Sequence, residues 1–401
     1  MKKRFLAAVL LLFTAVTMLE AEPLVVTAQV RDNPTLFIKD MPGQTELYKA
    51  LRSFVGASGW FDLSGNPESD YVLSPKFDGS TLVFELSLGG IPVKKWSIAK
   101  GNLTLRQLAA AAIDTIIEDS FKELKIKGFC SSSVAFCAQT SPGIRNIYIC
   151  DIDGQNVRQL TRVKTLCVEP AWSPSGNTVL YSKYGKSGIS VVETEVRPPH
   201  RSRMISSFPG INAGAALSPD GRKMAVILSP DHQVNLYVMD MGSRKKQRLT
   251  TGKAVEASPV WGPDGRQIAF VSDEGGSPKI NVINADGTGR RVLKSIGRTT
   301  VTPDWSKDNK IVYAALVNGN YTLGVYDMNT GETSRVTKES GNWESPAWAA
   351  DNRHVVAKRT AGGTSGIYVV DTWTGKVRPL LQTTHSLSMP AWSPCRPKKT
   401  L

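Results

Sequence analysis

The sequence predicts a two-domain protein in which a small N-terminal α+β domain is followed by an all-β six-bladed β-propeller. Three observations support this prediction. A motif whose anchor is tryptophan in five copies and Leu217 in one recurs six times at nearly constant spacing. Each interval contains short β-rich segments and tight turns, and the first third of the chain has neither feature. A chain of 401 residues is long enough to bury two hydrophobic cores.

The first 21 residues have the features of a secretory signal peptide. Lys2, Lys3 and Arg4 precede an apolar run over residues 5–19, which is shorter than a membrane-spanning helix, and Ala21 supplies a small residue for cleavage. We therefore expect cleavage near Ala21, export from the cytoplasm, and no transmembrane segment in the mature chain.

The chain is strongly basic. Its formal net charge is +14, or about +12 once the signal peptide with its three basic residues and one acid is removed. A basic surface favours anionic partners, but export argues against nucleic acid as the partner. Because the Lys and Arg residues are scattered through turns, with residues 244–246 as the only tight run, we interpret most of this charge as solvated surface.

Residues 22–129 are expected to form the α+β domain. A capping box at residues 104–107 precedes an apolar helical face over 105–117, and an earlier helix is expected over 47–55, ending near Gly56. Strands are expected at residues 24–30, 71–77, 81–88 and 94–99, with Asp78 and Gly79 forming a hairpin turn. The boundary with the second domain is placed near residues 127–133.

Residues 130–401 are divided by the tryptophan motif into units of about 44 residues. The clearest copies read Pro-Ala-Trp-Ser-Pro-Ser-Gly from Pro170 and Pro-Val-Trp-Gly-Pro-Asp-Gly from Pro259, and the anchor residues stand at positions 172, 217, 261, 305, 348 and 392. Each motif ends in a turn, since Pro presets φ and Gly permits a positive φ. Four short antiparallel strands in each unit correspond to one blade of a propeller.

The ends of the repeat array predict how the ring closes. The first unit lacks the motif and begins with residues 134–136, which align with residues 268–270, whereas the last unit has the motif and then stops. One blade is therefore split between the two ends. We expect the C-terminal strand around residues 391–393 to pair with the strand around residues 134–137, which closes six blades and removes the free edges of an open array.

The same alignment places Cys130 and Cys395 at one turn position of the split blade. We therefore predict a disulfide between them in an oxidising compartment. Cys137 and Cys150 are expected on neighbouring strands and could also form a disulfide, which would leave Cys167 without a disulfide partner. The alternative, which we favour, is that all three of these are small buried apolar side chains.

No motif in the sequence indicates catalysis or metal binding. A Gly-x-Ser-x-Gly nucleophile elbow is absent, and the four histidines fall in separate units without the spacing of zinc ligands. Asp151, Asp153 and Gly154 are read as a hairpin turn, because the segment is too short for a calcium loop. We expect a protein that is not an enzyme and that uses no metal and no cofactor.

Together these parts resemble the TolB family of the Tol-Pal envelope system. The resemblance rests on the signal peptide, the run Ser-Gly-Trp-Phe-Asp-Leu at residues 58–63, the hairpin ending Phe-Glu-Leu at residues 84–86, and six motifs of the Pro-Ala-Trp-Ser-Pro-Asp-Gly type. It extends over essentially the whole mature chain. It implies a periplasmic monomer within a multiprotein envelope complex that supports outer-membrane integrity and envelope constriction during cell division.

The resemblance also implies two binding sites. Members of the family bind the peptidoglycan-associated lipoprotein Pal through the loops that enter the innermost propeller strands. The matching residues here are Val168, Glu169, Ile211, Asn212, Ala213, Gly214, Glu256, Ala257, Ser258, Thr300, Val301, Thr302, Asn342, Trp343, Glu344, Ser345, Ser388 and Met389. Of these, Ile211 and Trp343 are expected either to anchor the partner or to pack within their loops.

The second implied site is the extreme mature N-terminus, which in the family binds the inner-membrane protein TolA as a mobile strand. The matching residues here are Glu22, Pro23, Leu24, Val25, Val26 and Thr27. A different hypothesis is a periplasmic propeller enzyme or sensor that acts on an anionic envelope polymer. That hypothesis predicts a pair of acidic or basic residues converging in the channel, whereas a mouth lined by small, polar and apolar side chains favours protein binding.

Overall fold

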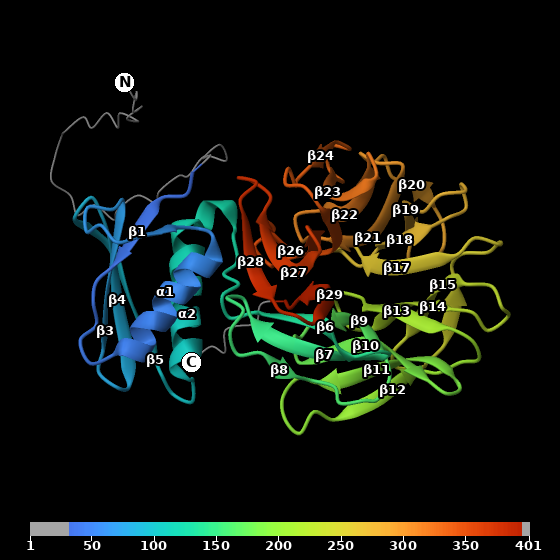
Figure 1. The fold of residues 1–401 in the computed structure, drawn as a ribbon, viewed down its shortest axis with the longest axis horizontal. Helices are drawn as coiled ribbons and strands as arrows, with labels where there is room; N and C mark the ends of the chain where they lie inside the picture. The colour runs from blue at the N-terminus through green and yellow to red at the C-terminus, as the bar shows by residue number, and fades with distance from the viewer. Residues whose placement is uncertain (1–31, 395–401) are drawn as a thin grey trace.

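The structure, a computed structural model, describes residues 32–394 and contains the two predicted parts, an α+β domain beside a six-bladed β-propeller (Figure 1). The signal peptide, its cleavage site, the strand expected over residues 24–30 and the TolA-type segment lie outside the described residues. Cys395 also lies outside them, so its disulfide with Cys130 stays a prediction.

A five-stranded sheet forms the base of the N-terminal domain, with the strand order β2-β1-β3-β4-β5. β1 (Thr35–Ile38) pairs in parallel with β2 (Asp62–Ser64) and β3 (Tyr71–Phe77), whereas β3, β4 (Thr81–Leu88) and β5 (Ile91–Ala99) form an antiparallel meander. The predicted hairpin over residues 71–88 is confirmed. The sequence does not predict β1 and β2, because strands of four and three residues are too short to show an alternating pattern.

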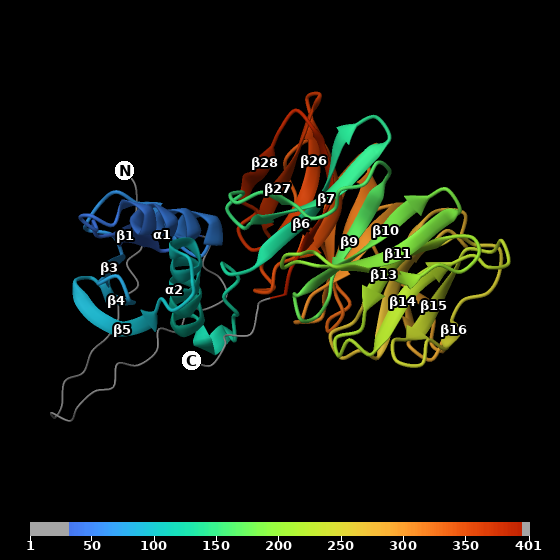
Figure 2. The same cartoon turned by 90° about the horizontal axis from the view of Figure 1, so that it is seen from below.

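Two helices lie between this sheet and the propeller (Figure 2). α1 (Thr45–Ser58) ends at Ser58 rather than near Gly56, because Gly59 is the residue that adopts the left-handed conformation, with φ 65°. α2 (Leu105–Ser120) begins with the predicted capping box, in which Thr104 and Gln107 each bond the backbone N–H of the other. A short 3-10 helix, η1 (Lys122–Leu124), follows α2.

Six four-stranded antiparallel sheets form the propeller, and the innermost strands contact one another in a closed ring. Written from the innermost strand outward, the sheets are β29 (Ser386–Trp392), β6 (Ser133–Ser141), β7 (Ile144–Asp151), β8 (Arg158–Gln159); β9 (Cys167–Trp172), β10 (Thr178–Gly185), β11 (Gly188–Glu195), β12 (Ser202–Ser206); β13 (Asn212–Leu217), β14 (Lys223–Leu228), β15 (Asn235–Asp240), β16 (Lys246–Arg248); β17 (Glu256–Trp261), β18 (Gln267–Ser272), β19 (Lys279–Asn284), β20 (Arg291–Val292); β21 (Thr299–Trp305), β22 (Lys310–Val317), β23 (Asn320–Asp327), β24 (Thr333–Arg335); β25 (Asn342–Trp348), β26 (His354–Ala361), β27 (Thr364–Asp371), β28 (Val377–Gln382).

The predicted closure of the ring is confirmed. β29 pairs antiparallel with β6, with Ala391 opposite Ala135 and Trp392 opposite Val134. Two tryptophans of the motif also join neighbouring blades. The indole N–H of Trp172 donates to the carbonyl of Ala391 at 3.0 Å. Trp261 makes the same bond to the preceding innermost strand. Trp305 and Trp392 instead donate to Asn309 and to Ser132 Oγ, so this bond between blades is a property of two of the motif tryptophans.

Cys137, Cys150 and Cys167 are free and buried, as the favoured interpretation predicts. Cys137 and Cys150 lie on adjacent strands but belong to different hydrophobic clusters, so they do not face each other. Burial raises the pKa of the Cys137 thiol to about 12. Because the thiolate is the reactive form, this residue is chemically inert at neutral pH.

The two domains are joined by a buried cluster at one edge of the propeller. The indole of Trp60 is 1% exposed and donates its N–H to Asp351, which lies in the turn of the fifth tryptophan motif, at 3.0 Å. The guanidinium of Arg353 lies over the rings of both Trp60 and Trp373, at 4.6 and 4.9 Å from their centroids. Arg353 also forms a salt bridge of 2.6 Å with Asp371. Both aromatic and charged side chains therefore hold the domains together.

A second contact joins α2 to the split blade. Arg106 donates hydrogen bonds to the carboxylates of Asp151 and Asp153 in the turn between β7 and β8. The interpretation of this segment as a hairpin turn is confirmed, with Gly154 at φ 79°. Its acidic side chains bind an arginine of the other domain.

Candidate partner-binding surface

A ring of six residues with positive φ surrounds the propeller channel. Each innermost strand contributes one of them: Glu169, Gly214, Ser258, Thr302, Ser345 and Met389, with φ between 49° and 57°. Each lies at a β-bulge that precedes the tryptophan motif, where the innermost strand shifts register against its neighbour. A bulge re-aims the side chain at that position, and all six residues line the channel. All six belong to the predicted Pal-type set.

The channel holds a cavity of about 530 Å³ that extends from this ring to the turns of the tryptophan motifs. We call the end where the innermost strands begin the mouth, and the end formed by the motif turns the motif face. Mostly Pro, Ala, Trp and Ser residues line the cavity, with Glu169, Asp304 and Lys307 as the charged residues. Glu169 accepts hydrogen bonds from Ser182 and from the backbone of Gly214, at 2.7 and 3.0 Å. A lining of small and apolar groups favours binding over catalysis.

The predicted mouth residues occupy distinct levels. Asn212, Glu256, Thr300 and Trp343, two positions before the ring, are buried, and Val168 and Ser388, one position before it, are also buried. The half-buried residues that form the surface of the mouth are Ile211, Ala213, Ala257, Val301, Asn342 and Glu344. The sequence prediction omits Cys167 and Leu387, which share the buried level of Trp343 and would be found by counting five residues back from each motif anchor.

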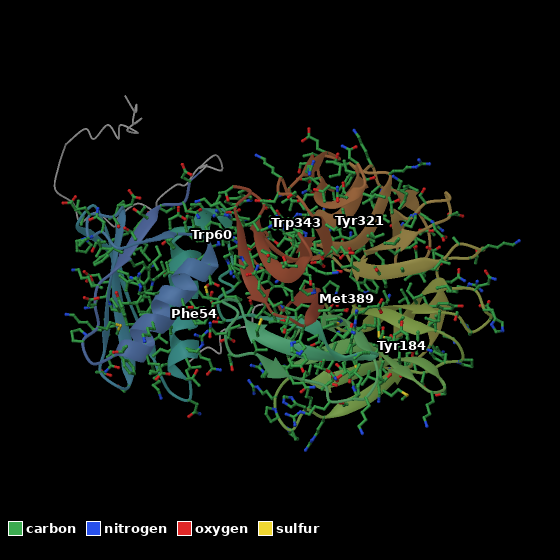
Figure 3. All side chains as sticks on the ribbon, viewed as in Figure 1. Phe54, Trp60, Tyr184, Tyr321, Trp343 and Met389 are labelled. Atoms are coloured by element: carbon green, nitrogen blue, oxygen red, sulfur yellow. The ribbon has the colours of Figure 1, made fainter. Side chains whose placement is uncertain are left out.

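Trp343 packs inside its loop. Its side chain is fully buried, the Tyr368 ring lies 6.0 Å away between centroids, and the Arg359 guanidinium lies over the indole at 5.3 Å. Figure 3 shows Trp343 within the β25 region and Met389 near the channel. Trp343 therefore supports the mouth from within and offers no exposed ring to a partner.

Buried polar side chains also fix the loops of the mouth. The Asn212 side chain accepts hydrogen bonds from Ser206 Oγ and Phe208 N and donates one to Phe208 O, which ties down the loop before β13. Glu256 is 1% exposed, and burial raises the pKa of its carboxyl despite the Arg290 guanidinium 3.5 Å away. The hydrogen bonds of Asn212 hold the surface residues of its loop in place before any partner arrives, whereas Glu256 Oε2 has no hydrogen-bond partner among the described residues.

Asp304 is a site residue that the sequence analysis misses. It stands where the other motifs have Ala or Val, and it lines the channel cavity. Burial raises the pKa of its carboxyl to about 6, although the backbone N–H groups of Trp348 and Trp305 act in the opposite direction. The N–H of Trp348 donates to Asp304 Oδ2 at 2.6 Å. The sequence does contain a signal for this residue, because Asp304 replaces the small apolar residue that the other motifs have at this position.

Asp304→Asn is expected to raise the stability of the protein at about pH 7.5 and to leave it almost unchanged near pH 4. The folded-state pKa of about 6 lies above the ordinary value of 3.8, so the folded state binds the proton more tightly and the wild type loses stability as the pH rises between these values. Asn keeps an oxygen for the Trp348 N–H and carries no charge. Thermal unfolding at both pH values measures the difference, and a variant less stable at the higher pH would contradict this account.

Other site types find no support in residues 32–394. Within this range no group of three or more His, Cys, Asp or Glu side chains is arranged to hold a metal ion. The same range contains no helix that is both long and apolar enough to cross a membrane.

Comparison with known proteins gives a consistent result. A family model described as the TolB β-propeller domain matches residues 121–396. The Tol-Pal system protein TolB of Gluconobacter oxydans is 33% identical over 320 residues, which cover 77% of this chain and 69% of that protein. The TolB of Francisella tularensis is 30% identical over 132 residues, and this match spans only 30% of the length of that relative.

A solved structure extends the likeness to both domains. The crystal structure of TolB from Acinetobacter baumannii superposes with a TM-score of 0.81, covering 91% of this chain and 97% of that one. The two sequences are 21% identical, so this likeness shows a shared fold. The agreement includes the N-terminal α+β domain, which lies largely outside the residues matched by the propeller family.

Proposed function

The chain belongs to the TolB family, and on that premise we propose that it is a periplasmic, non-enzymatic component of a Tol-Pal system that binds a Pal-type lipoprotein at the mouth of its propeller. The signal peptide would direct export and would be cleaved near Ala21 to give the mature periplasmic chain. The role that this implies is support of outer-membrane integrity and of envelope constriction during cell division.

The observation that carries the proposal is the preformed mouth. Six bulged strands place one residue each around the channel, and buried side chains such as Asn212 and Trp343 hold the loops above them. A platform ordered in this way loses little conformational entropy when a partner docks, so more of the contact energy remains as affinity. The half-buried surface is small, polar or apolar, as a protein interface requires.

We further propose that residues 22–27 bind a TolA-type inner-membrane partner. The support for this assignment is the family membership together with the position of the segment, which precedes the first described residue, Asp32, and β1 in the sequence. This site is separate in sequence from the mouth. One protein could thus contact partners of both membranes.

Ala257→Asp and Ala213→Asp are expected to weaken binding of the Pal periplasmic domain about tenfold or more, which equals about 1.4 kcal/mol. Both residues are half-buried in the mouth, where a new carboxylate would lose solvation on docking without gaining a partner. Gly214 is a poorer target, because its φ is +57° and an added Cβ would lie 3.2 Å from Pro259. Isothermal titration calorimetry with the mature chain measures the affinity.

The matched control is Lys307→Glu at the motif face of the same channel, which should bind Pal like the wild type. Removal of residues 22–27 should also leave Pal binding unchanged while abolishing capture of the TolA-type domain. No binding of Pal by the wild type, or loss of binding only in the Lys307 variant, would refute the proposed site.

A further inference from the structure

β12 presents the longest uncovered outer edge of the propeller. It has five residues, whereas the outermost strands β8, β16, β20 and β24 have two or three. β28 has six residues, but its edge is covered: Gly154 of the next blade packs so closely that an added Cβ would lie 2.2 Å from the Leu380 carbonyl. In the described part of the chain no strand pairs outside β12, which lies at the lower rim in Figure 1. An edge of this kind can template a further strand.

A groove of about 360 Å³ runs beside this edge. The residues that line it are Met204, Ile205, Ser206, Ser207, Phe208, Met239 and Arg244. Met204 has 60% of its surface exposed, and Phe208 is half-buried. The edge therefore lies next to a groove of mixed polar and apolar lining, in which Met204 and Phe208 could contact apolar side chains of an added strand.

The rim of the groove is cationic. Arg244 donates a hydrogen bond to the Ile205 carbonyl at 3.3 Å, and the Lys246 ammonium lies 3.6 Å from the centroid of the Phe208 ring. Neither Arg244, Lys245 nor Lys246 forms a salt bridge with an acid among residues 32–394. Arg203, on β12 itself, pairs with Glu193 but keeps 64% of its side chain exposed.

Asp240, the acidic residue on the same turn as these cations, already accepts hydrogen bonds within the turn. Asp240 Oδ1 accepts hydrogen bonds from the backbone of Gly242 and from both the backbone and the hydroxyl of Ser243. These bonds hold the pKa of Asp240 below its ordinary value. The carboxylate therefore folds the turn that presents Arg244, Lys245 and Lys246. None of these cations has an acidic partner among residues 32–394, while Arg244 bonds the Ile205 carbonyl and Lys246 lies against the Phe208 ring.

We propose that β12 and this groove bind an extended, acidic segment of a protein partner, which would pair with β12 as a fifth strand of the sheet. Side chains alternate along a strand, so one set of the incoming residues would contact Met204 and Phe208 while acidic neighbours meet Arg203, Arg244 and Lys246. A lipid surface would satisfy the cations but could not pair with the backbone of an edge strand. The site lies on the outer rim, apart from the mouth, and extends beyond the proposed function.

The probe for this site is a fluorescein-labelled peptide of about ten residues in which Glu alternates with Val, a length that matches an ordinary strand. Fluorescence anisotropy at low salt is expected to show binding to the mature chain, and Arg244→Glu combined with Lys246→Glu should weaken it about tenfold or more. Amide hydrogen exchange over residues 202–206 should slow when the peptide is bound, because pairing protects the edge.

Two controls separate strand pairing from simple charge attraction. The double variant Lys253→Glu and Lys338→Glu changes two exposed lysines elsewhere by the same total charge and should bind the peptide like the wild type. A peptide of the same composition with a central Pro in place of one Val should bind at least about tenfold more weakly, since Pro cannot donate to a strand ladder. Equal binding of the Pro peptide, equal loss in both double variants, or binding to anionic vesicles but not to the peptide would overturn the proposal.

Discussion

Arg353→Ala is expected to lower the free energy of unfolding by about 3–5 kcal/mol, the range found when one partner of a buried ion pair is removed. Arg353 is 4% exposed, donates to both oxygens of Asp371 and also bonds the side chain of Asn33 in the N-terminal domain. Without it, Asp371 loses its ion-pair partner while its carboxylate stays buried, and the rings of Trp60 and Trp373 lose the group that lies over both.

The loss should depend on pH. Burial alone would raise the pKa of Asp371, but the Arg353 hydrogen bonds and the nearby positive charges hold it well below its ordinary value. A carboxyl with a lowered folded-state pKa contributes stability that is present above its unfolded-state pKa, about 4, and that is lost as the pH falls through the folded value. The difference in stability between wild type and variant should therefore be largest near neutral pH and should narrow in acid.

Urea unfolding near pH 7 and at a pH below about 3, where Asp371 begins to take up its proton, measures both effects. The matched control is Lys376→Ala, because Lys376 forms an exposed salt bridge with Asp62 across the same domain boundary and its loss should cost no more than about 1 kcal/mol. An equal loss for the two variants, or a gap that does not change with pH, would show that the buried pair does not stabilise the interface as argued.

The sequence predicts the propeller well because its information is repeated. Six motif anchors at nearly constant spacing determine the blade number, and the missing motif in the first unit determines the pairing of β29 with β6. The domain interface has no such signal. Asp351 has the sequence of an ordinary turn residue in a degenerate motif, and only the packing of Trp60 above it, hundreds of residues away in the chain, makes it buried.

The sequence predicts the mouth residues only in part, because the motif spacing locates the loops but does not show which of their side chains are buried. Motif spacing locates the six loops that reach the channel, so the ring residues can be named from the sequence. The bulge before each motif adds a residue to the innermost strand, which shifts the alternation of inward and outward side chains. The sequence alone therefore cannot separate Ala257, which is half-buried in the mouth, from Glu256, which is buried beneath it.

Trp343→Ala is expected to lower the free energy of unfolding by about 3–5 kcal/mol, the usual cost of removing a buried aromatic side chain. The cavity would open in the core between the blade β21–β24 and the blade β25–β28, next in sequence to the mouth residues Asn342 and Glu344. Trp343→Phe should cost less, because it preserves part of the contact with Tyr368. Tyr184→Ala, at a half-exposed aromatic residue, is the control and should cost less than about 1 kcal/mol.

The same variants distinguish support from direct contact. If Trp343 only supports the loop, Pal binding should weaken in proportion to the loss of stability and should be largely recovered in Trp343→Phe. If Trp343 instead leaves its buried position to anchor the partner, the Ala variant should lose affinity with little change in unfolding, and Phe should not restore it. Denaturant unfolding and calorimetry on the same samples decide between these outcomes. The fully buried indole, held by Tyr368 and Arg359, favours the first, because extracting it would expose a large apolar surface before any contact is made.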